Sequence, residues 1–137
     1  MSMSNPTILL VDDEKRERDS MRRGLRRGGY TVLEASDYDA ALAAQKKHPG
    51  EIDLLLIDLS LPGGNGYDLS KALLAVEPHL RVLFMSGQAG AKMCKFFDMP
   101  LTDVHFLQKP FRPADLLRRV EVVLSLADPA GGSLSAH

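Results

Sequence analysis

The chain has 137 residues, of which 45% are apolar and 26% are charged, a composition that fits one globular domain with a core and leaves no room for a second domain. The formal net charge of −1 argues against a general nucleic-acid surface, which normally carries clustered Lys and Arg, so we expect no direct nucleic-acid partner. A single cysteine excludes an internal disulfide, and neither a signal peptide nor a membrane-spanning stretch is evident, so we expect a cytoplasmic protein without a membrane partner.

Short apolar runs alternate along the chain with helix-compatible segments. This strict alternation predicts an α/β fold in which a doubly wound, five-stranded parallel sheet has helices on both faces. We expect the domain to span residues 6–127, and the Gly- and Ser-rich residues 128–137 to form a flexible tail. The predicted strands are 7–11, 31–34, 53–58, 81–85 and 104–108, and the predicted helices are 14–27, 37–47, 65–76, 89–97 and 113–127.

Reactive groups follow four of the predicted strands. Asp12 and Asp13 end the first strand and Asp58 ends the third, whereas Ser86 and Lys109 follow the fourth and fifth. Ligands bind at the carboxyl ends of strands in open α/β sheets. We therefore expect these side chains to meet at one edge of the sheet.

This order of groups resembles the receiver domain of two-component response regulators, in a form like the chemotaxis regulators. The resemblance covers roughly residues 6–127 and includes Asp58, Pro62 and Gly66 of the loop that follows the third strand. It implies a flavodoxin-like fold with strand order 2-1-3-4-5. It also implies that the peptide bond between Lys109 and Pro110 is cis, a form that proline permits.

Three carboxylates at one sheet edge repel one another, and a divalent cation relieves that repulsion. Oxygen ligands point to Mg²⁺ or Mn²⁺. By resemblance, Asp13 and Asp58 bind the ion directly, Asp12 binds it through water, and the backbone carbonyl of Ser60 completes the protein's share.

Asp58 is the candidate nucleophile for a phosphoryl group, and Ser86 and Lys109 are the candidate donors to its oxygens. The resemblance implies a switch in which Ser86 moves toward the phosphoryl group and the aromatic side chain of Phe106 enters the vacated space. A plain core phenylalanine is an equally good interpretation of Phe106. Ser60 and Gln88 hold positions that tune loss of the phosphoryl group in the family.

Helix 14–27 carries many arginines interleaved with acids. A solvated face with the pairs Glu14–Arg18 and Asp19–Arg23 is the default interpretation. The alternative is docking of a histidine-bearing partner, which in this family approaches near the first helix and the loop after the fifth strand. The implied partners are a histidine kinase or histidine phosphotransfer protein, an unknown downstream protein and, in a homodimer, a second copy of the chain.

The leading hypothesis is a signalling receiver that takes a phosphoryl group onto Asp58 and changes a protein-binding surface. Such a protein catalyses its own phosphorylation and dephosphorylation and is no conventional enzyme. The chain is then either a free regulator or the receiver part of a hybrid sensor histidine kinase. A Mg²⁺-dependent aspartyl phosphatase fits less well, since such enzymes carry Asp-x-Asp after the first strand, and an unphosphorylated scaffold would need a degraded site.

Overall fold

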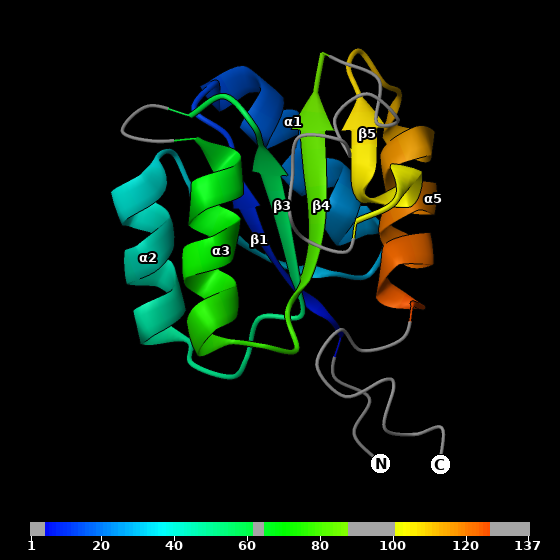
Figure 1. Cartoon of the computed structure of the whole chain (residues 1–137). Helices are drawn as coiled ribbons and strands as arrows, with labels where there is room; N and C mark the ends of the chain where they lie inside the picture. Colours follow the sequence, from blue (N-terminus) through cyan, green and yellow to red (C-terminus); the bar gives the residue numbers. More distant parts are fainter. Residues whose placement is uncertain (1–4, 62–64, 88–100, 127–137) are drawn as a thin grey trace.

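The computed structural model describes residues 5–61, 65–87 and 101–126. Within them, five strands form one sheet of order β2-β1-β3-β4-β5, and every neighbouring pair is parallel. The strand arrows labelled in Figure 1 accordingly point the same way. The strands are β1 Thr7–Val11, β2 Thr31–Ala35, β3 Leu54–Asp58, β4 Arg81–Ser86 and β5 Phe106–Gln108, and the helices are α1 Lys15–Arg27, α2 Tyr38–Lys47, α3 Gly66–Val76, α5 Pro113–Leu124 and the short 3₁₀ helix η2 Asp103–His105.

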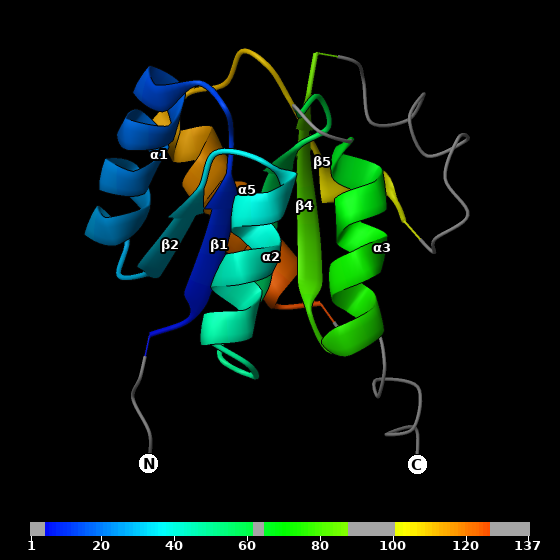
Figure 2. The same ribbon diagram turned by 90° about the vertical axis from the view of Figure 1, so that its left-hand side faces the viewer.

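Helices cover both faces of the sheet, as the alternation predicts. Alternate residues of β1 show this division, because Ile8 and Leu10 pack with α1 and α5 whereas Leu9 and Val11 pack with α2 and α3. Figures 1 and 2 show the sheet running between these two pairs of helices. Both faces of the central strands are therefore apolar, which explains why β1 and β3 read as continuous hydrophobic runs.

Two helices start, within one residue, where they were predicted, and each has a side-chain N-cap. The carboxylate of Asp37 accepts a hydrogen bond from the backbone N–H of Ala40 at 2.8 Å, and Asn65 caps α3 through the N–H of Asp68 at 2.8 Å. Pro113 is the first residue of α5, a position where its missing N–H costs nothing.

The fifth strand differs from the prediction, since it begins at Phe106 and residues 104 and 105 belong to η2. The backbone N–H of His105 donates to the carbonyl of Thr102 at 2.9 Å, which closes the 3₁₀ turn. The guanidinium of Arg119, on α5, donates to the carbonyls of Val104 and Phe106. A side chain from the helix that follows β5 thus donates to carbonyl groups near the start of this strand.

One further prediction concerns the end of the last helix. Helix α5 ends at Leu124, with Ser125 as its C-cap, and not at residue 127. The predicted helix 89–97, the tail 128–137 and Gln88 lie outside the described residues.

The charged face of α1 forms other pairs than those predicted. Glu14 is the N-cap of α1 and accepts a hydrogen bond from the N–H of Glu17. Arg18 pairs with Glu34 of β2 at 3.2 Å, while Asp19 pairs with Lys15 at 2.9 Å and Arg22 at 2.6 Å. Among the described residues these bonds replace the predicted Glu14–Arg18 and Asp19–Arg23 pairs, and the Arg18–Glu34 bond attaches α1 to the edge strand.

Within the described part of the chain, no helix combines the length and the apolar character that crossing a lipid bilayer requires.

Candidate functional site

The sheet brings Asp12 and Asp58 together at its carboxyl edge, at the top of Figure 1. Strands β1 and β3 are neighbours, and Val11 is in register with Ile57, so the residues that follow are adjacent. Asp12 is 0% exposed and Asp58 is 8% exposed. Carboxylates are rarely buried to this degree unless they are paired, so each needs a partner.

Asp12 is only partly satisfied. Its Oδ1 accepts a hydrogen bond from the N–H of Glu14 at 2.9 Å, whereas its buried Oδ2 has no hydrogen-bond partner among the described residues. Burial, and after it the nearby carboxylate of Glu17, raise the pKa of Asp12 to about 7, against the lowering effect of the Glu14 N–H. A buried acid with an unused oxygen is a group prepared for a cation or a proton.

Asp58 is bonded through both of its oxygens. The backbone N–H of Ser60 donates to Oδ1 at 2.9 Å, and the ammonium of Lys109 pairs with Oδ2. Lys109 directly follows β5, and its own N–H donates to the carbonyl of Ser86 at 2.7 Å, which ties the ends of β4 and β5 together. The peptide bond from Lys109 to Pro110 is cis, as predicted.

Lys109 has a second carboxylate partner. Its Nζ lies 3.0 Å from Oε1 of Glu17, on the first turn of α1. Burial alone lowers the pKa of the Lys109 ammonium, but the hydrogen bonds to Asp58 and Glu17 outweigh burial and hold this pKa above its ordinary value. Lys109 is therefore a permanent cation at this edge of the sheet.

Glu17 is the site residue that sequence reasoning missed. One oxygen from each of Asp12, Glu17 and Asp58 lies within 4.8 Å of the other two. The Asp12 carboxyl and then the Lys109 ammonium lower the pKa of Glu17. Of the two acids Asp12 and Glu17, the negative charge therefore stays on the more exposed one, Glu17. The available signal was its place, one turn into the helix that directly follows Asp12.

Asp13 is exposed, and among the described residues its carboxylate is not part of the cluster formed by Asp12, Glu17 and Asp58. Ser60 is exposed as well, and its N–H donates to the carboxylate of Asp58. The assignment of Asp13 and the Ser60 carbonyl as direct ligands therefore stays a prediction. The oxygens that the structure gathers come from Asp12, Glu17 and Asp58.

Ser86 and Phe106, the residues of the predicted switch, are both buried. Ser86 ends β4, and Phe106 is 3% exposed and stacks on Phe84 with ring centroids 5.4 Å apart. Phe106 thus lies in the apolar cluster on the α2–α3 face. This position agrees with the interpretation of Phe106 as a core residue, and the switch itself stays a prediction.

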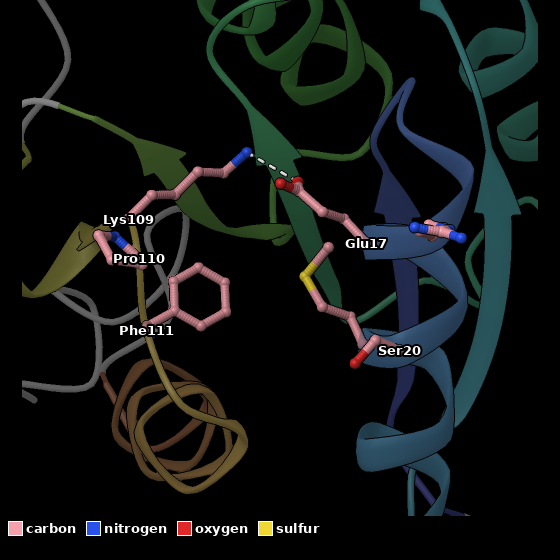
Figure 3. Close-up of a pocket in the computed structure, with 7 residues that line it drawn as sticks. Glu17, Ser20, Lys109, Pro110 and Phe111 are labelled. Carbon is pink, nitrogen blue, oxygen red and sulfur yellow. Dashed lines mark hydrogen bonds and ion pairs between the residues drawn. The ribbon is translucent and has the colours of Figure 1, made fainter.

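A pocket of about 390 Å³ opens beside the charged group. Figure 3 shows Glu17 and Lys109 extended toward each other at one side of it, while Phe111 points from the β5–α5 loop toward α1. The full lining is Arg16, Glu17, Ser20, Met21, Lys109, Pro110 and Phe111. A hollow between α1 and this loop therefore leads directly to the site.

Comparison with known proteins identifies the family of this chain. The family model described as the response regulator receiver domain matches residues 8–121. The chain belongs to this receiver family. The receiver fold is also that of solved structures: the non-phosphorylated HemR receiver domain from Leptospira biflexa is 34% identical, with a TM-score of 0.76, 91% of this chain covered and 98% of that one.

Curated relatives of this receiver domain differ in overall length. The response regulator receiver protein CpdR of Brucella abortus is 29% identical over 88% of this chain and 98% of its own length. The sensor kinase CckA of the same organism is 32% identical over 89% of this chain but only 13% of its own length. The transcriptional regulatory protein ResD of Bacillus subtilis is 31% identical, and the chain spans 52% of it.

Receiver domains generally bind Mg²⁺, and the residues of this receiver domain fit such an ion. The donor set is all oxygen, and the unpartnered Oδ2 of Asp12 is a buried acceptor that a hard cation would satisfy. Receiver domains also interact with histidine kinases and with downstream effectors.

Proposed function

We propose that this receiver domain accepts a phosphoryl group onto Asp58 from a phosphohistidine and then presents a changed surface to another protein. The donor is a histidine kinase or a histidine phosphotransfer protein, and the exchange takes place in the cytoplasm. The observation that supports this best is the pairing of Asp58 with Lys109 at the buried carboxyl edge of the sheet. An acid that already holds a permanent cation is placed to react with an anionic group.

The transfer requires an oxygen of Asp58 to attack phosphorus in line with the bond that breaks. The new bond joins the Asp58 oxygen to phosphorus, the phosphorus–nitrogen bond to the histidine breaks, and the freed imidazole takes a proton from water. The pocket between α1 and the β5–α5 loop lies beside Asp58's partner, Lys109. A histidine carried on a partner's helix can approach through this hollow.

Negative charge grows on the phosphoryl oxygens during transfer, and the site has the groups that oppose it. Lys109 supplies an ammonium with three donors, and Ser86 supplies a hydroxyl at the end of the neighbouring strand. Asp12, Asp13, Asp58 and the carbonyl of Ser60 would hold Mg²⁺ or Mn²⁺, with Glu17 close by. When bound, the ion offsets charge on the phosphoryl oxygens and on the acids themselves.

The output step follows from the position of Ser86 and Phe106 on adjacent strands. Phe84 pairs with Phe106 across β4 and β5, and Ser86 lies two residues further along β4. A movement of Ser86 toward the phosphoryl group would change the space available to the Phe106 ring. The changed surface would be offered to a downstream protein or, in a homodimer, to a second copy of the chain.

Two contexts are compatible with this function. CpdR matches along nearly its whole length, which favours a free regulator, while the match to a short part of CckA favours the receiver part of a hybrid sensor histidine kinase. A Mg²⁺-dependent aspartyl phosphatase is the weaker alternative, because the acids after β1 are adjacent and the proposed nucleophile ends β3.

The deciding experiment is intact mass after incubation with acetyl phosphate and Mg²⁺. We expect one phosphoryl adduct, and none with EDTA or in the Asp58→Asn variant, which keeps the size of the side chain. An adduct that persists in Asp58→Asn would place the phosphoryl group elsewhere. The absence of any adduct in the unmodified chain, with acetyl phosphate and with a phosphorylated histidine kinase, would contradict the proposal.

A further inference from the structure

Lys109 forms ion pairs with two acids, and only one of these acids is the proposed phosphoryl acceptor. Asp58 comes from the end of β3, whereas Glu17 comes from α1 and lies 3.0 Å from the ammonium. Figure 3 shows the Glu17 and Lys109 side chains meeting across the space between α1 and the β5–α5 loop. Lys109 is thus held from two directions.

The first turn of α1 fixes the backbone that carries Glu17. The N–H of Glu17 donates to the carboxylate of Glu14 at 3.0 Å. The guanidinium of Arg18 donates to the backbone carbonyl of Asp12 at 2.7 Å and so ties this turn to the end of β1. The carboxylate of Glu17 therefore starts from a fixed position close to Lys109, unlike an acid on a free helix end.

The charge balance around Lys109 changes when Asp58 is phosphorylated. An aspartyl phosphate carries more negative charge than the free carboxylate from which it forms, and its phosphoryl group presents three acceptor oxygens. Lys109 must then turn its donors toward these oxygens, while Glu17 still attracts the ammonium. An oxygen of Glu17 also lies within 4.8 Å of one from Asp58, so its negative charge opposes the approach of an anionic donor.

We propose that Glu17 is a positioning residue that holds Lys109 toward α1 and repels the incoming group, and that it thereby slows phosphorylation of Asp58. This inference rests on the proposed function. It gives the unphosphorylated site a resting state in which the lysine is engaged on both sides. The hydrogen bond between Glu17 and Lys109 must weaken before Lys109 can direct all of its donors to the phosphoryl oxygens.

The test compares phosphorylation rates of the whole chain and of two variants at saturating Mg²⁺. Glu17→Gln keeps the shape of the side chain and removes its charge. Asp19→Asn removes the same charge from the same helix, but Asp19 pairs with Lys15 and Arg22 and not with Lys109. With acetyl phosphate as donor and intact mass as readout, we expect Glu17→Gln to react about three- to tenfold faster and Asp19→Asn to stay near the parent rate.

A second donor separates electrostatic positioning from a structural effect. Phosphoramidate carries less negative charge than acetyl phosphate, so the gain in Glu17→Gln should be smaller with phosphoramidate. A change that merely loosens the fold would alter both rates equally. Thermal unfolding of each variant, followed by circular dichroism, checks that the folds are equally stable.

Each other outcome overturns the inference in a recognisable way. Equal rates for the parent chain and Glu17→Gln would remove any role of Glu17 in the reaction. A slower Glu17→Gln that binds Mn²⁺ more weakly, measured by calorimetry, would make Glu17 a ligand for the cation instead. Failure of the unmodified chain to form any adduct would overturn the proposed function itself, and this inference with it.

Discussion

The two edges of the sheet treat their acids in opposite ways. At the amino edge, Asp53 is exposed, and its carboxylate accepts a hydrogen bond from the N–H of Thr7 at 2.8 Å. At the carboxyl edge, Asp12 is fully buried and one of its oxygens has no partner among the described residues. Both acids adjoin central strands, so residue type alone does not distinguish a structural carboxylate from a functional one. The difference is that Asp12 is buried and one of its oxygens lacks a donor or cation among the described residues.

The largest expected effect concerns the charge of Asp12. The pKa of Asp12 is raised from 3.8 to about 7 in the folded chain, chiefly by burial. Between these values the folded chain keeps a proton that the unfolded chain has released, so stability is lost as the pH rises from about 4 to 7. Asp12→Asn removes this loss and should be more stable than the parent chain at pH 8 by about 2–4 kcal/mol without a divalent cation.

The measurement is urea unfolding of both chains at pH 5 and pH 8, in EDTA and in Mg²⁺. Mg²⁺ should stabilise the parent chain at pH 8 and do so much less at pH 5, where Asp12 is protonated. Asp53→Asn is the control at the other edge, and we expect it to cost less than about 1 kcal/mol at either pH. Equal pH profiles for the parent chain and Asp12→Asn would show that burial of this acid carries no penalty.

The carboxyl edge of the sheet also constrains the backbone at Gly66. A Cβ at Gly66 would lie 2.4 Å from the carbonyl oxygen of Asp58 and 3.0 Å from Cα of Leu59. Gly66→Ala should therefore push α3 away from the end of β3 and cost about 1–3 kcal/mol. Because the clash is with Asp58 itself, the rate of its phosphorylation should fall as well.

Gly24→Ala supplies the matched control, since Gly24 also lies in a helix and a Cβ added there would meet no neighbouring side chain or strand of the described chain within 4 Å. This change should stabilise the chain by about 0.5–1 kcal/mol, because alanine is the better helix former. Chemical denaturation gives both values. A Gly66→Ala chain as stable as the parent would show that the junction between β3 and α3 yields easily.

Much of this arrangement could be predicted from the sequence, because it depends on local patterns. The apolar runs before Asp12 and Asp58 predict buried strands, and parallel strands bring their carboxyl ends together. Lys109 was found by its place after the last strand. These inferences need only the order of segments along the chain.

The missed features depend on contacts that appear only in the folded chain. Glu17 reads as one of many charges on α1 until Lys109, 92 residues away along the chain, is seen to reach it. The start of β5 was predicted too early, because residues 104 and 105 belong to the 3₁₀ helix η2 and the pairing with β4 begins at Phe106. No periodicity in the sequence records such a contact.

The smallest expected effect separates two phenylalanines of one stack. Phe84 is 0% exposed on β4, whereas Phe106 is 3% exposed on β5, the edge strand of the described sheet. A hydroxyl added to a buried ring costs about 1–3 kcal/mol when it finds no partner. If Phe106 can turn outward, as the switch requires, Phe106→Tyr can place its hydroxyl in water and should cost about 1 kcal/mol less than Phe84→Tyr. Urea unfolding of the two variants measures this difference, and equal losses would make Phe106 a core residue like its neighbour.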